Sequence, residues 1–353
     1  MTYPSGPYGY GYPPPPPPPQ PGVIPLAPLG LSQILTGAFT TVGRYWKQLL
    51  GVAVIAYGGA TLLVVAALGI AYAVVGDHLP GVFDLPRGAH PSWEDGRPLL
   101  IAFGCVWLVA MIGLLLASGV VYAASPAVVQ VAVLGHPTTL RAVWRRSWSR
   151  MPAVLGTVFL TGLVLLIPTV VFLATFAGLI VAIGGGSPVT LVAMSVGGAM
   201  LAVLLTAPLP IWLWVKFSLA PTAAVIESQG PLAAMRRSSQ LVRGSWWRIF
   251  GGTLMAGVIA AVINWALQQV FGALVSAPLS FTEGVEAKSA TEILLLLAPF
   301  LVIAIIGSLI GQFVSSILPP LVTGLLYIDR RIRTEDLAPT LAQAAAEAPP
   351  FSR

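Results

Sequence analysis

The residues best suited to chemistry lie in one short polar stretch, residues 214–252. It holds Glu227, the one acidic residue between positions 98 and 281, and then a basic and aromatic cluster. A lone carboxylate beside guanidinium groups favours charge-assisted hydrogen bonds, whereas general acid–base catalysis needs a second acid or a histidine nearby. We therefore expect Glu227 to brace the fold by pairing with a nearby arginine or with a neighbouring repeat. The members of the cluster are Arg236, Arg237, Arg243, Arg248, Trp246 and Trp247.

A second stretch, residues 134–150, has the same character. Arg145 and Arg146 precede a serine, as Arg236 and Arg237 do, and tryptophans flank them. Tryptophan rings favour the headgroup level of a membrane, where arginines pair with lipid phosphates. We expect both stretches to form interfacial helices that contact anionic lipid headgroups. The alternative is that their charges only set the membrane topology.

The motifs of known enzyme and metal sites are missing. The sequence has no phosphate-binding GK[ST] loop, no GxSxG and no HExxH. One connection is rich in histidine and acidic residues, but their irregular spacing indicates a solvated loop rather than a metal site. We expect no enzymatic activity, no cofactor, no metal and no nucleic-acid partner. The residues of that connection are Asp77, His78, Asp84, His90, Glu94 and Asp95.

The composition is that of an integral membrane protein. Apolar residues make up 56% of the 353 residues and charged residues only 8%, whereas soluble domains carry about 25% charged residues. Each of six apolar runs exceeds the roughly 20 residues that a membrane-spanning helix needs. The predicted fold class is all-α, with six transmembrane helices. The runs cover about residues 51–75, 99–124, 153–183, 189–215, 249–275 and 292–317.

Uncharged polar residues mark two of these runs. Asn264 and Gln268 share one face of the fifth, and Gln312 lies on the sixth beside the small residues Gly307 and Gly311. Small residues let helix backbones approach, so we expect these side chains to form hydrogen bonds between helices. A polar track for a substrate is the alternative. No Asp, Glu, His or Arg lies between the ends of the runs, which argues against an ion-coupled pump.

The connections alternate in charge. Only Arg87, Arg97 and Lys288, of 18 Lys and Arg residues, lie in the three connections on one side. Short loops rich in Lys and Arg remain in the cytoplasm. We therefore expect a protein of the cell membrane with both termini cytoplasmic.

The chain divides into a tail, a membrane domain and a second tail. Residues 1–24 are rich in Tyr, Gly and Pro, with seven consecutive prolines, and are predicted to be disordered. The tail could dock a protein partner through an aromatic-lined groove or serve only as a spacer. Residues 25–333 form the predicted membrane domain, and residues 334–353 form a cytoplasmic tail.

A three-fold repeat is predicted within the membrane domain. Each unit consists of an amphipathic helix, a span, an outer loop and a returning span that ends near a proline: Pro126, Pro221 or Pro320. The units cover about residues 29–133, 134–228 and 229–333.

The polar stretches resemble those of a group of bacterial membrane proteins, over the inner face of most of the chain. They look like the membrane domain attached to glycerophosphoryl diester phosphodiesterases, and like actinobacterial polytopic proteins with proline-rich tails. The phosphodiesterase catalytic domain is absent from this sequence, so the resemblance implies no such activity. The matching residues are Lys216-Phe217, Leu219-Ala220-Pro221, Val225-Ile226-Glu227, Ala234, Arg237-Ser238, Leu241-Val242, Gly244, Trp247-Arg248, the segment 325–335 and the segment 25–39.

The sequence therefore predicts a non-enzymatic membrane protein that organises lipids or a partner protein at the inner face. A transporter or channel for a small or lipidic solute is the alternative. Convergence of polar residues on one cavity would favour transport.

Overall fold

The computed structural model describes residues 20–83, 92–184, 197–198, 208–281 and 290–346, and within these ranges every regular element is a helix. Six helical segments are long and apolar enough to cross a membrane, so the predicted all-α fold class is confirmed. Most of the fourth predicted span, residues 189–215, lies outside the described residues. The elements are α1 (Leu31–Val75), η1 (Gly76–His78), α2 (Pro80–Phe83), α3 (Trp93–Val133), α4 (Leu140–Gly184), α6 (Pro208–Phe217), α7 (Ala220–Ile226), α8 (Pro231–Val242), α9 (Trp246–Phe281), α10 (Ala290–Glu335) and α11 (Leu337–Ala346).

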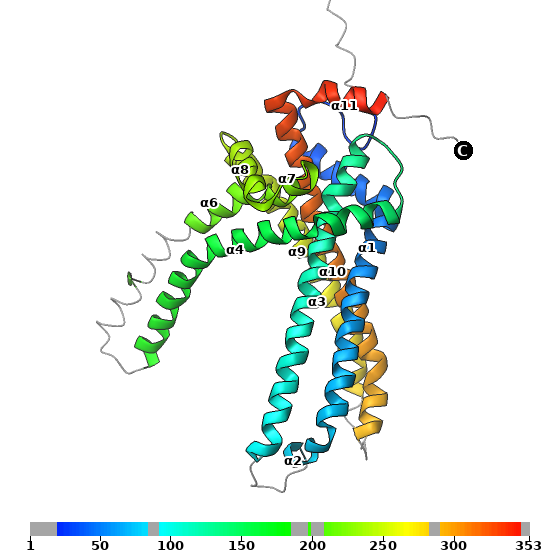
Figure 1. Cartoon of the computed structure of the whole chain (residues 1–353), viewed down its shortest axis with the longest axis vertical. Helices are drawn as coiled ribbons and strands as arrows, with labels where there is room; N and C mark the ends of the chain where they lie inside the picture. Colours follow the sequence, from blue (N-terminus) through cyan, green and yellow to red (C-terminus); the bar gives the residue numbers. More distant parts are fainter. Residues whose placement is uncertain (1–19, 84–91, 185–196, 199–207, 282–289, 347–353) are drawn as a thin grey trace, which may run out of the picture.

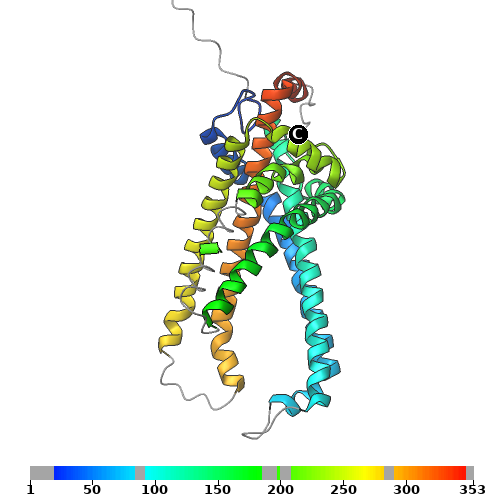
Figure 2. The same ribbon diagram turned by 90° about the vertical axis from the view of Figure 1, so that its left-hand side faces the viewer.

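Two long helical hairpins form the body of the molecule. Helix α1 packs against α3, and α9 packs against α10 (Figure 1). Helix α4 crosses the others near one end and then bends away from them. Helices α8 and α11 and the start of the described chain gather at that same end, which we call the terminal face (Figure 2).

Helix α1 combines the predicted interfacial helix with the first span. The backbone leaves helical geometry at Tyr45 (φ −116°, ψ 19°), which divides the two parts. The Tyr45 hydroxyl donates a hydrogen bond of 2.7 Å to the carbonyl of His136. Three residues on, Gln48 donates one of 3.0 Å to the carbonyl of Thr138. The kink is therefore fixed against the α3–α4 connection.

The buried core lies near the terminal face. Leu29, Leu219, Leu325 and Tyr327 are fully buried. The distant halves of the long helices expose apolar side chains, and Leu62, for example, is 72% exposed. In lipid an exposed apolar side chain carries no penalty, so this distribution fits a membrane-embedded bundle.

Two helices extend past the prolines that were expected to end them. Helix α3 continues through Pro126 to Val133, and α10 continues through Pro319 and Pro320 to Glu335. These two helices therefore run beyond residues 124 and 317, where the predicted spans ended. A proline inside a helix costs about 3 kcal/mol. Burial of the extensions offsets that cost, since the residues beyond the prolines form the centre of the core, among them Val128, Val129, Leu321, Leu325 and Leu326.

Both predicted tails contribute packed residues. Val23 and Ile24 are buried, and the Val23 amide donates a 3.1 Å hydrogen bond to the carbonyl of Ala132, so the packed chain begins before the predicted boundary at residue 25. In α11, Leu337 and Leu341 pack against the core. Residues 1–19, with the proline run, and 347–353 lie outside the described residues. The three-fold repeat stays a prediction; its two internal boundaries fall in connections between helices, whereas its last boundary, residue 333, falls inside α10.

Candidate functional site

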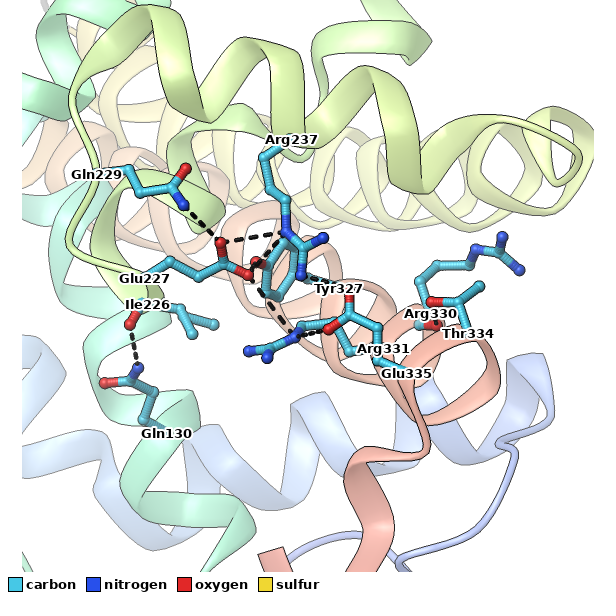
Figure 3. Close-up of polar contacts among 10 residues, drawn as sticks. All are labelled: Gln130, Ile226, Glu227, Gln229, Arg237, Tyr327, Arg330, Arg331, Thr334 and Glu335. Carbon is cyan, nitrogen blue, oxygen red and sulfur yellow. Dashed lines mark hydrogen bonds and ion pairs between the residues drawn. The ribbon is translucent and has the colours of Figure 1, made fainter. Parts of the chain in front are cut away.

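Glu227 lies at the carboxyl end of α7 and is the centre of a polar network on the terminal face (Figure 3). Its carboxylate accepts hydrogen bonds of 2.9 Å from Arg237 and 2.9 Å from Gln229. The hydroxyl of Tyr327 also donates to it, and Arg331 lies 3.7 Å away. The ion pair predicted for Glu227 is thus present, and Arg237 is the partner.

A second carboxylate closes this network. Glu335 pairs with Arg237 and, at 2.8 Å, with Arg331. Burial lowers the pKa of Arg237, but its hydrogen bonds to Glu227, Tyr327 and Glu335 outweigh that effect and raise the pKa above the ordinary arginine value. The guanidinium therefore stays charged and joins α7, α8 and α10.

A second ionic cluster surrounds Asp329, whose side chain is fully buried. Its oxygens lie 3.0 Å from Arg248 and 3.0 Å from Arg333. They also accept a 2.8 Å hydrogen bond from the amide of Leu29. The carbonyl of Leu29 accepts hydrogen bonds from both arginines, at 2.8 Å from Arg333. This cluster ties the start of α1 to α9 and α10.

Sequence reasoning did not single out Asp329 or Tyr327 as site residues. A signal was present, because Asp329 and Arg333, and also Arg331 and Glu335, are four residues apart. Opposite charges at that spacing are neighbours on one helix face. These residues were named only within the resemblance.

The arginines predicted to contact lipid fall into two groups. Arg237 and Arg248 are held in the ionic clusters. The side chains of Arg145, Arg146, Arg236 and Arg243 are exposed. The two tryptophans also differ: Trp247 is 78% exposed, whereas Trp246 stacks on Phe250 with ring centroids 5.0 Å apart.

The predicted polar helix contacts also divide. A side chain added at Gly311 of α10 would collide with the Asn264 amide of α9, so Asn264 lies in the contact between these helices. Gln268 and Gln312 are exposed. Gln312 follows Gly311 by one residue, a rotation of about 100° around the helix, which carries it away from that contact.

A cavity of about 460 Å³ is lined by residues of α3, α4, α6, α7, α9 and α10. Prolines of all three predicted repeat units line this central cavity: Pro126, Pro221, Pro319 and Pro320. Because the corresponding landmarks of the units are spread along the sequence, only the folded chain brings them together. The volume of the central cavity falls in the range of small-molecule sites, about 300–1,000 Å³.

The central cavity is apolar with a minority of polar groups. The residues that line it and carry hydroxyl groups include Tyr122, Thr161, Thr222 and Thr253. Pro126 has no amide hydrogen, so it cannot donate the usual helical hydrogen bond to the carbonyl of Tyr122. Apolar walls with a few polar groups suit an amphipathic molecule better than a polar solute or an ion.

In the described part of the chain, no three His, Cys, Asp or Glu side chains could hold one metal ion. The carboxylates of Glu227, Asp329 and Glu335 are engaged by arginines. The geometry of these clusters serves to hold helices together.

The helices and the cavity define the class as a multi-pass, all-helical membrane protein. Comparison with known families adds that residues 100–328 match a family described as a domain of unknown function, DUF7847, and the chain belongs to this family. No link to the membrane domain of glycerophosphoryl diester phosphodiesterases is found. Neither the curated proteins nor the solved structures contain a match.

Proposed function

We propose that this chain is a non-enzymatic protein of the cell membrane that holds lipid at the cytoplasmic leaflet. The observation that carries the proposal is the central cavity, whose lining includes Pro221 and Thr222 of α7, the helix that ends beside Glu227 on the terminal face. Its apolar walls suit a lipid tail, and its hydroxyls suit the polar part of a lipid.

The charge pattern supports the orientation. The exposed arginines Arg145, Arg146, Arg236 and Arg243 belong to helices at the terminal face. Lys and Arg concentrate on the cytoplasmic side of membrane proteins. Anionic lipids of the cytoplasmic leaflet attract such residues by about 1 kcal/mol each.

Filling the cavity tests the lipid function. Gly162 lines the cavity, and a Cβ added there meets no atom within 4 Å, so we chose Gly162→Leu to add apolar volume at the wall without displacing the backbone. Purified full-length protein is stripped of lipid, titrated with dioctanoyl phosphatidylglycerol and followed by native mass spectrometry. Gly162→Leu is expected to weaken binding about ten-fold, which corresponds to a steric cost of about 1–3 kcal/mol.

Gly257→Leu is the matched control. Gly257 lies on α9, is exposed, meets open space and does not line the cavity. The control should bind as the wild type does. Equal binding by Gly162→Leu and the wild type would contradict retention of lipid in the cavity.

Transport of a small or lipidic solute is the alternative use of the same cavity. Proteoliposomes that contain the full-length protein would show solute flux or lipid scrambling in that case. Flux that Gly162→Leu abolishes would replace the proposal of lipid retention by one of transport.

The proline-rich tail is proposed to serve a separate role, as a docking segment for a protein partner. Seven consecutive prolines favour the extended polyproline II helix that aromatic-lined grooves bind. Deletion of residues 1–19 should abolish capture of that partner and leave lipid binding unchanged.

A further inference from the structure

A second, smaller pocket lies where α6, α8 and α9 meet, separate from the central cavity. It has a volume of about 280 Å³, and we call it the cationic pocket. Trp212 and Lys216 are four residues apart and face it from α6, whereas Trp214 and Phe217 of the same helix line the central cavity. Helix α6 thus separates the two spaces.

Two cations line this pocket, Lys216 and Arg243, and its lining includes no acidic residue. Arg237 and Arg248, on either side of Arg243 in sequence, are neutralised by carboxylates. Arg243 is exposed and has no ion pair among the described residues. The positive charge of the pocket is therefore uncompensated, and an anion would complement it.

The walls of the pocket are fixed by the packing of three helices. The Ser238 hydroxyl of α8 donates a 2.8 Å hydrogen bond to the carbonyl of Lys216. The ammonium group of Lys216 lies 4.6 Å from the ring centroid of Trp212, which also lines the pocket. Gly244, at φ +77°, permits the sharp turn from α8 into α9 that places Arg243 at the rim.

The size and aromatic lining indicate which anion fits. The cationic pocket is below the usual range of about 300–1,000 Å³ for whole small-molecule ligands, so it suits a headgroup rather than an entire lipid. Trp212 and Trp246 wall it, and tryptophan favours the headgroup level of a bilayer. A phosphate that projects from the membrane surface meets both conditions.

We infer that the cationic pocket binds the phosphate of an anionic phospholipid through Lys216 and Arg243. This inference specifies the headgroup class of the lipid function proposed above, but it concerns a different pocket and can hold or fail independently. Neither Lys216 nor Trp212 belongs to the arginine clusters that the sequence indicated.

The test uses full-length protein and three probes: dioctanoyl phosphatidylglycerol, dioctanoyl phosphatidylcholine and inorganic phosphate. Native mass spectrometry gives the affinity of each. Lys216→Gln and Arg243→Gln should each weaken binding of phosphatidylglycerol about five-fold, and the double variant about thirty-fold, since each basic residue contributes about 1 kcal/mol. Binding of phosphatidylcholine should change by less than two-fold, which is roughly the limit expected without a net headgroup charge.

The control removes two positive charges elsewhere on the same face. Arg145 and Arg236 are exposed and do not line the pocket, so Arg145→Gln/Arg236→Gln should retain phosphatidylglycerol. An equal loss in this control would overturn the pocket in favour of general surface charge. Unchanged binding in the Lys216/Arg243 double variant would also overturn it. Inorganic phosphate that binds as tightly as the lipid would overturn the assignment to a lipid.

Variants at the two sites separate the two proposals. If Gly162→Leu binds lipid normally while the Lys216/Arg243 double variant loses phosphatidylglycerol, the central cavity fails and the cationic pocket stands. If Gly162→Leu loses lipid while the Lys216/Arg243 double variant binds phosphatidylglycerol normally, the cationic pocket fails and the central cavity stands.

Discussion

The buried carboxylate of Asp329 gives the sharpest test of how the terminal face is held together. Replacing both of its partners, in Arg248→Gln/Arg333→Gln, leaves a fully buried negative charge with only the Leu29 amide as donor. Breaking a buried ion pair in this way costs about 3–5 kcal/mol. At roughly 1.3 °C per kcal/mol for a chain of 353 residues, the melting temperature should fall by at least about 4 °C.

The opposite change should be milder. Asp329→Asn removes the buried charge, and the two arginines that remain are about one-third exposed and can be hydrated. Asp329→Asn should therefore lower the free energy of unfolding by about 3 kcal/mol or less, the lower limit of the range given for breaking a buried ion pair. The triple variant, with all three charges removed, should recover much of the stability that the double variant lost, because no uncompensated charge remains.

The assay is thermal unfolding of the purified full-length variants in one detergent, followed by tryptophan fluorescence. The order of melting temperatures is the critical result. If Asp329→Asn lowers the melting temperature of the double variant by as much as it lowers that of the wild type, the three residues do not act as a unit. In that case a buried uncompensated charge is not the cause of the instability.

Three other predictions concern the first ionic network, the helix contact and the orientation. Glu227→Gln should lower the free energy of unfolding by about 1–3 kcal/mol, because it weakens the bond with Arg237. Tyr327→Phe removes one hydrogen-bond donor to Glu227 and should cost about 1 kcal/mol. A larger loss of stability in Tyr327→Phe than in Glu227→Gln would contradict this ranking. Gly307→Ala should destabilise the protein by about 1–3 kcal/mol because the methyl group collides with Cβ and the ring of Phe271 on α9, whereas Gly257→Ala should not destabilise it; equal melting temperatures would argue against close α9–α10 packing. In a Cys105→Ser background, the cysteine of Ser92→Cys should react with a membrane-impermeant thiol reagent in intact cells. The cysteine of Ser149→Cys should react only after permeabilisation. Labelling of Ser149→Cys in intact cells would show that the orientation is the opposite of the one proposed.

The membrane architecture could be predicted because it depends on composition and local pattern. Long apolar runs and few charges are properties of the sequence itself, and they predicted six spanning helices. The continuation of α3 through Pro126 and of α10 through Pro319 could not be predicted in the same way. Whether a helix continues through a proline depends on how well the residues beyond the proline pack, and here they include the buried Val129 and Leu325.

The candidate site was predicted only where its contacts join residues that are close together in the sequence. Glu227 and Arg237 are ten residues apart, so the local sequence was enough to name Arg237 as one possible partner, beside Arg236 and a neighbouring repeat. Asp329 and Leu29 are 300 residues apart, and nothing in either local sequence indicates the other. The central cavity is also a tertiary property, because it exists only where prolines of three separate segments converge.

The bond between Leu29 and Asp329 has a consequence for biogenesis. The chain enters the membrane from its amino end, yet the groups that fasten the start of α1 lie near the end of α10. Closing a loop of such length is slow, and its entropic cost is met only when the last contacts form. The start of α1 must therefore remain without these bonds until synthesis is almost complete. A chain truncated before residue 329 would keep the contacts of Tyr45 and Gln48 with the α3–α4 connection but would lack Asp329, and with it the bond that holds Leu29.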